Sequence, residues 1–356
     1  MNVLSLFDGM SCGQIALREL GVKVDKYFAA EIDKYAIAQT QLNFPETIQL
    51  GNVTDVRAKD LPKIDLLLGG SPCQGFSFAG RRLNFNDPRS ALFFEFVRIL
   101  NEIRAINPDV IFLLENVRMK REYQDIISDK LGLRPVLINS ARVSAQNRER
   151  LYWSNILTRQ IDQSGTIETA IPQPEDLGLL FRDIMEEDVP DNYYLSEEVV
   201  ANRIRHKERN KSKGNGFGMV VRTLNDKSTS ICVGGRGIYD LVSVTETKRT
   251  KKDDGVNKNT GIRRYTPTEC SRLQTIPEWY RWECSNTQKY KMLGNGWTVK
   301  VIMHILQYLK EKNGVSLDTS VGVSISDEDG GDYDTTVAPV SELFRAGEEG
   351  KNNVPF

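Results

Sequence analysis

The chain has 356 residues, of which 40% are hydrophobic and 27% are charged, and its formal net charge is −1. These are ordinary values for a soluble globular protein with a sizeable core, arranged as one large domain or two modest ones. No run of about 18 apolar residues is present, and residues 1–9 lack the regions of a signal peptide. We therefore expect no membrane span and a cytoplasmic location.

The cysteines and histidines indicate which kinds of catalytic or metal site this chain is expected to have. Five cysteines form no Cys-x-x-Cys pair, which argues against a disulfide framework and a structural zinc site, so no metal is expected. The two histidines, His206 and His304, have no sequence context that fits a cysteine–histidine hydrolase. A nucleophilic cysteine in this chain would therefore take a carboxylate as its acid–base partner.

Charge is distributed unevenly along the chain. From Arg203 to Arg264 there are sixteen Lys or Arg against six Asp or Glu, an excess of ten positive charges. From Asp318 to Glu349, nine acidic residues stand against one Arg, an excess of eight negative charges. The cationic segment indicates a polyanionic partner, although a solvated loop region explains the same charges equally well.

In chain order, the first 155 residues alternate between two patterns. Short apolar runs predict strands at Val3–Phe7, Tyr27–Ala30, Ile64–Leu68, Val110–Leu114, Pro135–Ile138 and Leu151–Ile156. Apolar residues at helical spacing predict helices at Gln14–Leu20, Lys34–Leu42, Ala91–Ile103 and Tyr123–Lys130. This alternation predicts a doubly wound α/β domain, in which helices cover both faces of a mainly parallel sheet.

The regular pattern stops after Ile156. A short acidic helix is expected after the proline-containing stretch 171–174. The basic segment that follows holds two short predicted strands, Met219–Leu224 and Ser230–Val233, separated by turns rich in Gly, Asn and Lys. A small, irregular, partly β region is therefore expected here.

Regular pattern returns near residue 266. Thr266 fits a helix N-cap with Pro267 at the first helical position, and an amphipathic helix is predicted from Val299 to Lys312. The acidic segment beyond it is expected to be a flexible tail.

A cysteine follows directly after one of the predicted strands. Residues 69–80 read GGSPCQGFSFAG, so Cys73 lies just past a strand end, behind a proline that stiffens its backbone. A structural cysteine more usually lies within the strand, whereas open α/β sheets bind ligands outside the carboxyl ends of their strands. Cys73 is therefore a candidate site residue.

The turn after the first predicted strand reads LFDGMSCG at residues 6–13. Its two glycines let a ligand approach the backbone and the next helix, although a plain tight turn fits as well and the GxGxxG fingerprint is absent. The second strand ends near Glu31, which suits the two hydroxyls of a ribose or an exposed surface position. Together the two features indicate a nucleoside-containing ligand.

The sequence LLENV at residues 113–117 ends another predicted strand in a glutamate. Glu115 should therefore emerge at the same sheet edge as Cys73, from a strand that we expect to be adjacent. A buried glutamate needs a partner, so a functional role is favoured over a structural one.

Three polar residues alternate in the segment QNRER before the last predicted strand. In an extended chain Gln146, Arg148 and Arg150 share one face, where they suit a phosphate or the edge of a base. A solvated edge strand would show the same alternation.

These motifs together carry a family resemblance. From Leu4 to about Leu309 the chain resembles the DNA (cytosine-5) methyltransferases of bacterial or phage type, with a catalytic core similar to that of eukaryotic de novo enzymes. The shared segments, in that family's order, are FDG, the glutamate after the second strand, SPCQ-x-FS, DPRS-x-LFFEF, ENV, Q-x-R-x-R, a variable region, RRYTPTECSRLQTIP and YKMLGNGWTV. The pair SPCQ-x-FS and ENV at this spacing is highly specific.

The resemblance implies that Cys73, Glu115, Arg148 and Arg150 are catalytic. Attack of the Cys73 thiolate on C6 of cytosine would break the aromaticity of the ring and make C5 nucleophilic. Glu115 would hydrogen-bond or protonate N3, and Arg150, with Arg148 nearby, would hold O2. C5 would then take a methyl group from S-adenosylmethionine, giving S-adenosylhomocysteine, and loss of the C5 proton would release Cys73. The cytosine must first be flipped out of the duplex.

The resemblance also implies binding residues. The S-adenosylmethionine pocket is expected from Phe7, Asp8, Gly9, Met10, Ser11, Cys12, Glu31, Ile32, Asn52, Val53, Pro72, Leu92, Gly296 and Trp297. DNA contacts are expected from Gln74, Ser77, Arg81, Arg82, Gln146, Arg236 and Asn295. Trp297 would close the cofactor pocket, and residues 74–89 would form a mobile loop over the flipped base.

Some positions depart from the family pattern. Many members carry Gly-Gly where this chain has Ser11-Cys12, Asp where it has Asn52, and Ser where it has Gly296. The Ser-Cys pair and GNGW are closer to the eukaryotic de novo enzymes. Asn52 keeps an acceptor for the adenine amino group.

The resemblance divides the chain into four regions. These are a catalytic and S-adenosylmethionine-binding domain (1–157), a linker with a small irregular target-recognition domain (158–262), a return to the catalytic domain (263–313) and the acidic tail (314–356). Double-stranded DNA is the expected partner of a monomeric enzyme, with a cognate restriction endonuclease left open. The target sequence is not readable from the chain.

Two alternatives to this function remain. A transfer-RNA methyltransferase of the same superfamily shares the cysteine and ENV chemistry, but the long basic variable region favours DNA. A catalytically silent homologue that only binds nucleic acid would have lost Cys73 or Glu115, and both are present.

Overall fold

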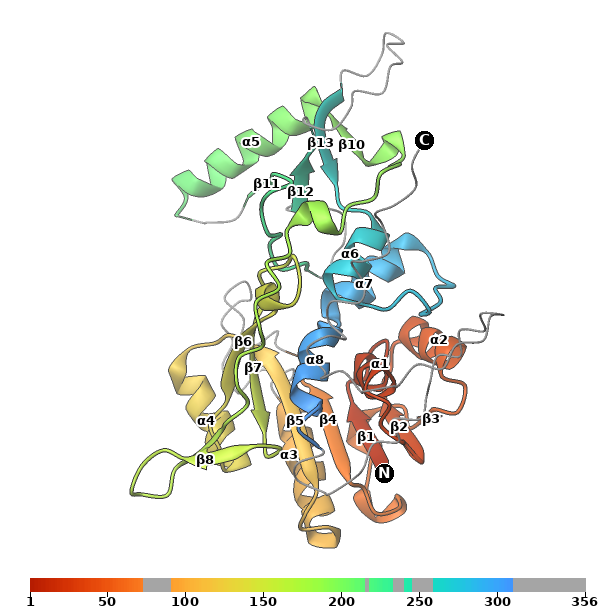
Figure 1. Cartoon of the computed structure of the whole chain (residues 1–356), viewed down its shortest axis with the longest axis vertical. Helices are drawn as coiled ribbons and strands as arrows, with labels where there is room; N and C mark the ends of the chain where they lie inside the picture. Colours follow the sequence, from red (N-terminus) through yellow and green to blue (C-terminus); the bar gives the residue numbers. More distant parts are fainter. Residues whose placement is uncertain (73–90, 215–217, 233–239, 245–258, 310–356) are drawn as a thin grey trace, which may run out of the picture. The chain divides into compact units, whose positions relative to one another are not determined.

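The computed structural model describes residues 1–72, 91–214, 218–232, 240–244 and 259–309 (Figure 1). All of these residues belong to one compact unit, Met1–Asp318. Among them, no helix is long and apolar enough to cross a membrane.

A seven-stranded sheet organises the first half of the chain. Its strand order is β3-β2-β1-β4-β5-β7-β6, and β7 is antiparallel to both of its neighbours while the other pairs are parallel. The strands are β1 (Asn2–Leu6), β2 (Lys26–Ala30), β3 (Ile48–Gln49), β4 (Leu66–Gly70), β5 (Ile111–Val117), β6 (Val136–Asn139) and β7 (Glu149–Ser154). Because β1 lies between β2 and β4, the chain winds outward in both directions from the middle of the sheet.

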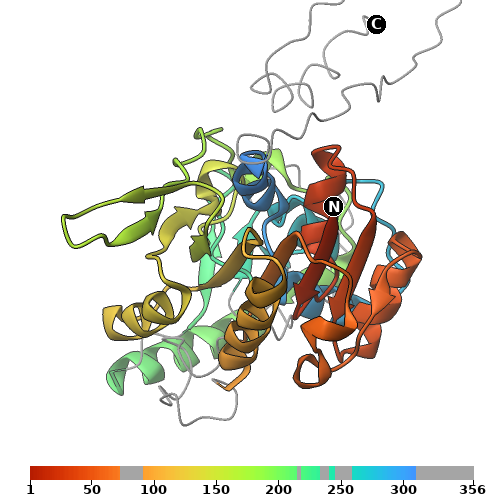
Figure 2. The ribbon, with the colours of Figure 1, turned by 90° about the horizontal axis from the view of Figure 1, so that it is seen from below.

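Helices cover both faces of this sheet. Figure 2 shows α1 (Cys12–Glu19) and α8 (Val299–Leu306) on one side and α3 (Ala91–Ile106) and α4 (Arg121–Leu131) on the other. Successive strand residues point to opposite faces, so Leu66 and Leu68 of β4 join the first core cluster and Leu67 joins the second. The apolar runs in the sequence therefore reflect strands that are buried on both faces.

The predicted doubly wound, mainly parallel fold is confirmed. The six predicted strands and four predicted helices of the first half are all present, with ends displaced by up to three residues. The sequence analysis missed β3, which has only two residues. The helix α2 (Lys34–Asn43) begins at an Asp33 side chain that accepts a hydrogen bond from the Tyr35 amide, as expected for a helix N-cap.

A second, smaller sheet follows. Its order is β10-β13-β12-β11, with β10 (Tyr194–Ser196), β11 (Val220–Arg222), β12 (Asp240–Ser243) and β13 (Asn259–Arg264). A separate hairpin pairs β8 (Thr158–Gln160) with β9 (Ile167–Thr169). Helix α5 (Glu197–Ser212) runs beside the small sheet and buries none of its residues (Figure 1). Single 3₁₀ turns occur at Val53–Asp55, Ala58–Asp60, Ser140–Arg142, Phe181–Asp183 and Asp191–Tyr193.

The predictions for this second half were less accurate. The strand predicted at Met219–Leu224 corresponds to β11, whereas the described part of Ser230–Val233 forms no strand. The short acidic helix expected after residue 174 is absent from the described chain, where two 3₁₀ turns and β10 precede α5. Weak apolar periodicity in a highly charged segment explains why α5, β10 and β13 were not predicted.

The return to the large sheet begins as predicted. The Thr266 side chain accepts from the Glu269 amide and caps α6 (Pro267–Leu273), with Pro267 as the first helical residue. Helix α7 (Asn286–Asn295) was not predicted. The last predicted helix corresponds to α8, and its final predicted residues, 310–312, lie outside the described residues.

Candidate active site

The carboxyl ends of β1, β2, β4 and β5 lie at one edge of the large sheet. Gly70, the last residue of β4, pairs with Glu115 in β5, so the prediction that these two strands are neighbours is correct. The chain then continues through Ser71 and Pro72 toward Cys73. Cys73 itself lies outside the described residues, as do the expected DNA-contact residues Gln74, Ser77, Arg81, Arg82 and Arg236.

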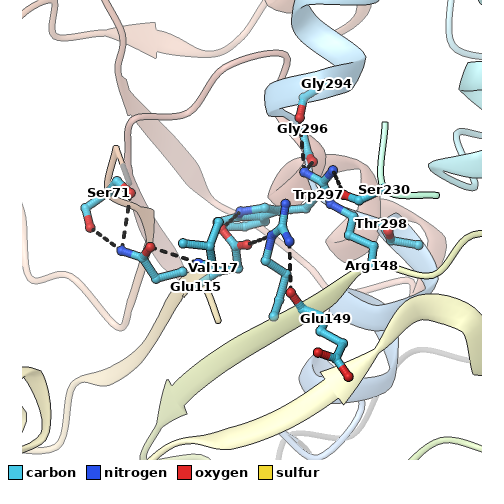
Figure 3. Close-up of polar contacts among 12 residues, drawn as sticks. Ser71, Glu115, Val117, Arg148, Glu149, Ser230, Gly294, Gly296, Trp297 and Thr298 are labelled. Carbon is cyan, nitrogen blue, oxygen red and sulfur yellow. Dashed lines mark hydrogen bonds and ion pairs between the residues drawn. The ribbon is translucent and has the colours of Figure 1, made fainter. Parts of the chain in front are cut away.

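Glu115 is held by two donors. Its Oε1 lies 2.9 Å from Nε of Arg150, and its Oε2 accepts a hydrogen bond of 3.0 Å from the indole Nε1 of Trp297 (Figure 3). Arg150 reaches Glu115 from β7, which runs antiparallel to β5 and pairs its Tyr152 with Glu115. The two charged side chains are only 15% and 11% exposed, which makes their interaction stronger than that of a surface ion pair.

The residue after Glu115 fixes the chain that leads to Cys73. The Asn116 side chain donates to Ser71 Oγ at 3.0 Å and to the Ser71 carbonyl at 3.4 Å, and both residues are buried (Figure 3). Asn116 therefore ties the end of β5 to the segment Ser71-Pro72. The motifs ENV and SPC are both visible in the sequence. The hydrogen bonds from Asn116 of ENV to Ser71 of SPC were not predicted.

Arg148 lies near Arg150, as predicted, but its side chain binds other groups of the protein. Its two terminal nitrogens donate to Ser230 Oγ and to the carbonyls of Gly294 and Gly296 at 2.9–3.2 Å (Figure 3). They also donate to the Ile231 carbonyl at 3.0 Å. Burial lowers the pKa of Arg148 to about 10, so the guanidinium keeps its charge at neutral pH. With its terminal nitrogens committed, Arg148 serves as an internal brace, and Arg150 remains the arginine beside Glu115.

Gln146 also requires a correction. Its side chain is fully buried, and it donates to the Leu273 carbonyl and to Gln274 while accepting from the Ile231 amide at 2.8 Å. The prediction that Gln146, Arg148 and Arg150 point the same way assumed an extended segment. β7 begins only at Glu149, so Gln146 lies before the strand and packs inside the protein.

The turn after β1 adopts strained backbone conformations. Phe7, Gly9 and Ser11 have φ values of 59°, 58° and 64°, in the left-handed region that favours glycine. The Gly9 amide donates to Glu31 Oε2 at 2.8 Å, so the two features that indicated a nucleoside ligand are in direct contact. Strain of this kind persists where surrounding structure enforces it, often at ligand sites.

Glu31 is anchored by backbone amides. Its Oε1 accepts from the amides of Ile32 and Asp33, each at 2.8 Å, in addition to the Gly9 contact on Oε2. A carboxylate offers about four acceptor positions, so one remains for a ligand hydroxyl. If both ribose hydroxyls bind Glu31 as predicted, one hydroxyl must donate to a carboxylate position that a backbone amide already occupies.

Asp8 lies in a buried polar network behind this turn. It accepts from the hydroxyl of Tyr27 at 2.9 Å and from Ser11, and burial raises its pKa to about 6. The contribution of Tyr27 was missed because the sequence shows it only as an apolar strand residue. Burial raises the pKa of the Cys12 thiol to about 12, so Cys12 remains a neutral packing residue.

The remaining predicted cofactor residues differ in how far their side chains are exposed to solvent. Asn52 is exposed, and its Oδ1 already accepts from the Thr54 amide at 3.1 Å. Ile32 is 74% exposed. Met10 and Val53 are buried, whereas Pro72, Leu92 and Gly296 are half-buried. Asn295, expected to contact DNA, is exposed at the end of α7.

Comparison with solved structures defines the class of the fold. The structure is similar to that of a Spodoptera frugiperda DNMT2 variant, with a TM-score of 0.63 and 22% identity over 86% of this chain and 99% of that one. It is also similar to the Entamoeba histolytica methyltransferase EhMeth, with a TM-score of 0.66 and 17% identity over 87% and 98% of the two chains. The fold is therefore that of the S-adenosylmethionine-dependent methyltransferases.

Sequence comparison identifies the family. The chain belongs to the C-5 cytosine-specific DNA methylase family, which matches residues 1–311. It is 34% identical to the Type II methyltransferase M.HpaII of Haemophilus parainfluenzae, over 87% of this chain and 89% of that one. It is 32% identical to the Type II methyltransferase M1.ScrFI of Lactococcus lactis subsp. cremoris, over 87% and 78% of the two chains. The resemblance inferred from the motifs is confirmed.

Proposed function

We propose that this chain transfers a methyl group from S-adenosylmethionine to C5 of a flipped-out cytosine in a specific double-stranded DNA sequence. The observation that supports this most directly is the Glu115–Arg150 pair at the end of β5. It lies one strand away from the end of β4, where the chain runs into Ser71-Pro72-Cys73. The Glu115–Arg150 pair therefore lies at the sheet edge where the chain leaves β4 through Ser71 and Pro72, the two residues that precede Cys73 in the sequence.

Each side chain has a step that suits its chemistry. The Cys73 thiolate forms a bond to C6 of cytosine, and the electron pair displaced from the C5–C6 double bond makes C5 nucleophilic. Glu115 binds N3, and Arg150, already beside Glu115, stabilises the negative charge that develops on O2. C5 would then form a bond to the methyl carbon as the bond from that carbon to the donor sulfur breaks, and S-adenosylhomocysteine would leave. Removal of the C5 proton would return the electron pair that expels the Cys73 sulfur.

The residues at the end of β1 and β2 fit the proposed methyl donor. S-adenosylmethionine supplies an electrophilic methyl group on a sulfonium. Glu31, pre-oriented by three backbone amides, is suited to a ribose hydroxyl, and the exposed Ile32 beside it offers an apolar surface for the adenine. Asp8 stands behind the turn and supports its strained backbone through Ser11 and Tyr27.

Double-stranded DNA is the substrate that the family favours over transfer RNA. The family description names DNA, and the relatives M.HpaII and M1.ScrFI are Type II methyltransferases. The transfer-RNA alternative is therefore set aside. A silent homologue is disfavoured because Glu115 keeps the ion pair with Arg150 that the reaction needs.

The basic segment supplies a surface for the DNA backbone. Helix α5 carries Arg203, Arg205, Lys207, Arg209 and Lys211 against the three acidic residues Glu197, Glu198 and Glu208. Arg205, Lys207, Arg209 and Lys211 are exposed to solvent, where they would neutralise phosphates, and Arg203 is half-buried. Base contacts that select the target sequence would come from other parts of this segment.

The proposal is tested by trapping the covalent adduct. A DNA library copied on one strand with 5-fluorodeoxycytidine blocks the last step, because fluorine does not leave C5 as a proton does. With S-adenosylmethionine, the wild-type protein should form a protein–DNA complex that survives denaturing electrophoresis. Cys73→Ala should form none, whereas Cys232→Ala, a change at an exposed cysteine, should behave as wild type. Equal adduct yield from Cys73→Ala would contradict the mechanism.

A further inference from the structure

Trp297 joins two parts of the site that are far apart in the sequence. It follows the end of α7 and precedes α8, yet its indole Nε1 donates to Oε2 of Glu115, 182 residues away in the chain, at 3.0 Å (Figure 3). The other oxygen of Glu115, Oε1, is bound by Arg150. The two donors therefore grip the carboxylate from opposite sides.

Gly70 makes room for the indole ring, and Gly13 lies beside the far edge of the ring. A Cβ atom at Gly70 would lie 2.8 Å from Nε1 of Trp297 and 3.2 Å from Oε2 of Glu115, closer than such atoms tolerate. A Cβ atom at Gly13, in α1, would lie 3.5 Å from Cζ3 of Trp297. The ring thus lies across the end of β4, with its N–H at Glu115 and its opposite edge toward the helix that follows the β1 turn.

The backbone that carries Trp297 is firmly held. The carbonyl of Gly296, the preceding residue, accepts from Arg148 at 2.9 Å and from Gln274 Nε2 at 2.9 Å. Arg148 also binds the Gly294 carbonyl at 3.1 Å, and Gln274 binds the Leu293 carbonyl at 2.7 Å. Both braces are buried. The backbone position from which the indole reaches Glu115 is therefore held independently of Glu115. The indole is thus able to orient the Glu115 carboxylate.

A glutamate needs more than one anchor to hold its plane. The terminal torsion of Glu is broad, so a single bound oxygen leaves the carboxylate free to rotate. With Arg150 on one oxygen and the indole on the other, rotation is blocked and about two of the four acceptor positions remain open. Those positions would accept hydrogen bonds from the 4-amino group of a cytosine and from N3 when N3 carries a proton.

We propose that Trp297 is a positioning residue for Glu115. Its indole N–H fixes the plane of the carboxylate that receives the cytosine, and its ring links that carboxylate to the cofactor side of the sheet at α1. This role is distinct from closing the cofactor pocket, which needs only an aromatic ring. It rests on the proposed function, because the orientation of Glu115 matters to catalysis only if cytosine binds there.

The first experiment separates the N–H group from the ring. Trp297→Phe keeps an aromatic side chain and removes the donor. We expect kcat to fall by about 10- to 100-fold, while KM for S-adenosylmethionine and for DNA changes by less than about 3-fold, since misorientation of a reacting group acts on the chemical step. Trp282→Phe, at a half-buried tryptophan that packs on Tyr280 and Lys289, is the matched control and should leave both constants unchanged.

Gly70→Ala tests the same contact from its other side. The added Cβ would crowd the indole N–H and also Oε2 of Glu115. We expect kcat to fall at least as far as in Trp297→Phe, and the combined loss to be smaller than the product of the two single losses, because both changes disrupt one shared interaction.

A fluorescence experiment tests the contact without any turnover. Glu115→Gln should change the emission of the wild-type protein, because a carboxylate accepting from an indole N–H is replaced by an amide. The same change made in the Trp297→Phe protein should leave the emission of the remaining tryptophans unaltered. This readout also applies to a variant with no activity.

The outcomes distinguish this inference from the proposed function. Wild-type protein that makes no 5-methylcytosine defeats the proposed function, and the positioning role falls with it. Active wild-type protein with unchanged kcat in Trp297→Phe would overturn the positioning role alone. A raised KM for S-adenosylmethionine at unchanged kcat would also overturn it, since Trp297 would then serve only the cofactor pocket.

Discussion

The two sheets of this protein are stabilised in different ways. The seven-stranded sheet is buried on both faces, and each face has its own extensive core cluster. Among its described residues, the four-stranded sheet has its own cluster of three buried apolar residues, Leu195, Met219 and Leu241, while Val242 of β12 joins the first cluster of the large sheet. No residue of α5 is fully buried, and Val200 is its contact with the small cluster. Packing therefore determines the geometry of the large sheet, whereas charge is the dominant feature of the small one.

This difference matches two kinds of task. In the proposed mechanism Glu115, Arg150 and Trp297 must keep a fixed geometry, and they project from or against the large sheet. A surface that follows a phosphate backbone needs positive charge and adaptability more than a fixed core. The contrast leads to four predictions, which act first on the large sheet and then on the small one.

The largest effect is expected at the centre of the large sheet. Glu115→Gln keeps the size of the side chain but removes the charge that binds Arg150 and the group that assists at N3. We expect methyl transfer to fall by about 10²- to 10⁴-fold, the usual contribution of a positioned acid or base. Single-turnover transfer of labelled methyl groups measures it, and a loss below about 10-fold would show that Glu115 is not part of the chemistry.

The next prediction concerns the connection between the two sheets. Arg263 of β13 and Glu269 of α6 form a buried pair, with side chains 1% and 0% exposed and two hydrogen bonds of 2.5 and 2.7 Å. Glu269→Gln should lower the free energy of unfolding by about 3–5 kcal/mol, because a buried guanidinium loses its counter-charge. Urea unfolding measures this.

A double variant provides the control for that pair. Arg263→Met with Glu269→Leu removes both charges and should recover most of the stability lost in Glu269→Gln. If the single change costs less than about 1 kcal/mol, the connection between the sheets does not depend on this pair.

The third prediction is a pH dependence that originates in the large sheet. Burial raises the pKa of Asp8 to about 6, above the value of about 3.9 in an unfolded chain. The folded protein then binds more protons than the unfolded chain between these values, so the contribution of Asp8 to stability falls as pH rises from about 4 to about 6. In Asp8→Asn, the unfolding free energy should change by about 1–3 kcal/mol less between pH 4 and pH 6 than it does in the wild-type protein. If the pH dependence of the unfolding free energy is the same in Asp8→Asn and in the wild-type protein, the folded protein does not raise the pKa of Asp8.

The smallest effect is expected on the small sheet. Arg209→Gln and Lys211→Gln, at exposed positions of α5, should each weaken DNA binding a few-fold and reduce the slope of log affinity against log salt by about one. Lys59→Gln, at an exposed position beside the large sheet, is the matched control and should leave the slope unchanged. Equal slopes for all three would mean that α5 does not contact the DNA backbone.

The sequence predicted the large sheet well because its signals are local. Runs such as Leu66–Leu68 are apolar on both faces, and they end in glycines that mark the strand end, so the positions of β4 and β5 followed directly. The Thr266 N-cap was likewise readable from one residue and the proline after it. Family motifs then supplied the chemistry of Cys73, Glu115 and Arg150.

What the sequence did not predict depends on contacts between distant segments. The roles of Gln146 and Arg148 as buried braces follow from where residues 230–231, 273–274 and 294–296 return to the end of β7. The hydrogen bond from Trp297 to Glu115 likewise spans most of the chain. Charged segments such as α5 have little apolar periodicity, so their structure was not readable either.

The central claim is that Cys73 and Glu115 methylate cytosine at C5 in a specific DNA sequence. It is tested most directly by mapping methylation at single-base resolution on plasmid DNA from a methylation-free host that expresses this chain. The account predicts 5-methylcytosine confined to one short motif with the wild-type protein, and none with Cys73→Ala. Folded wild-type protein that leaves the plasmid unmethylated, or methylation that persists in Cys73→Ala, would contradict it.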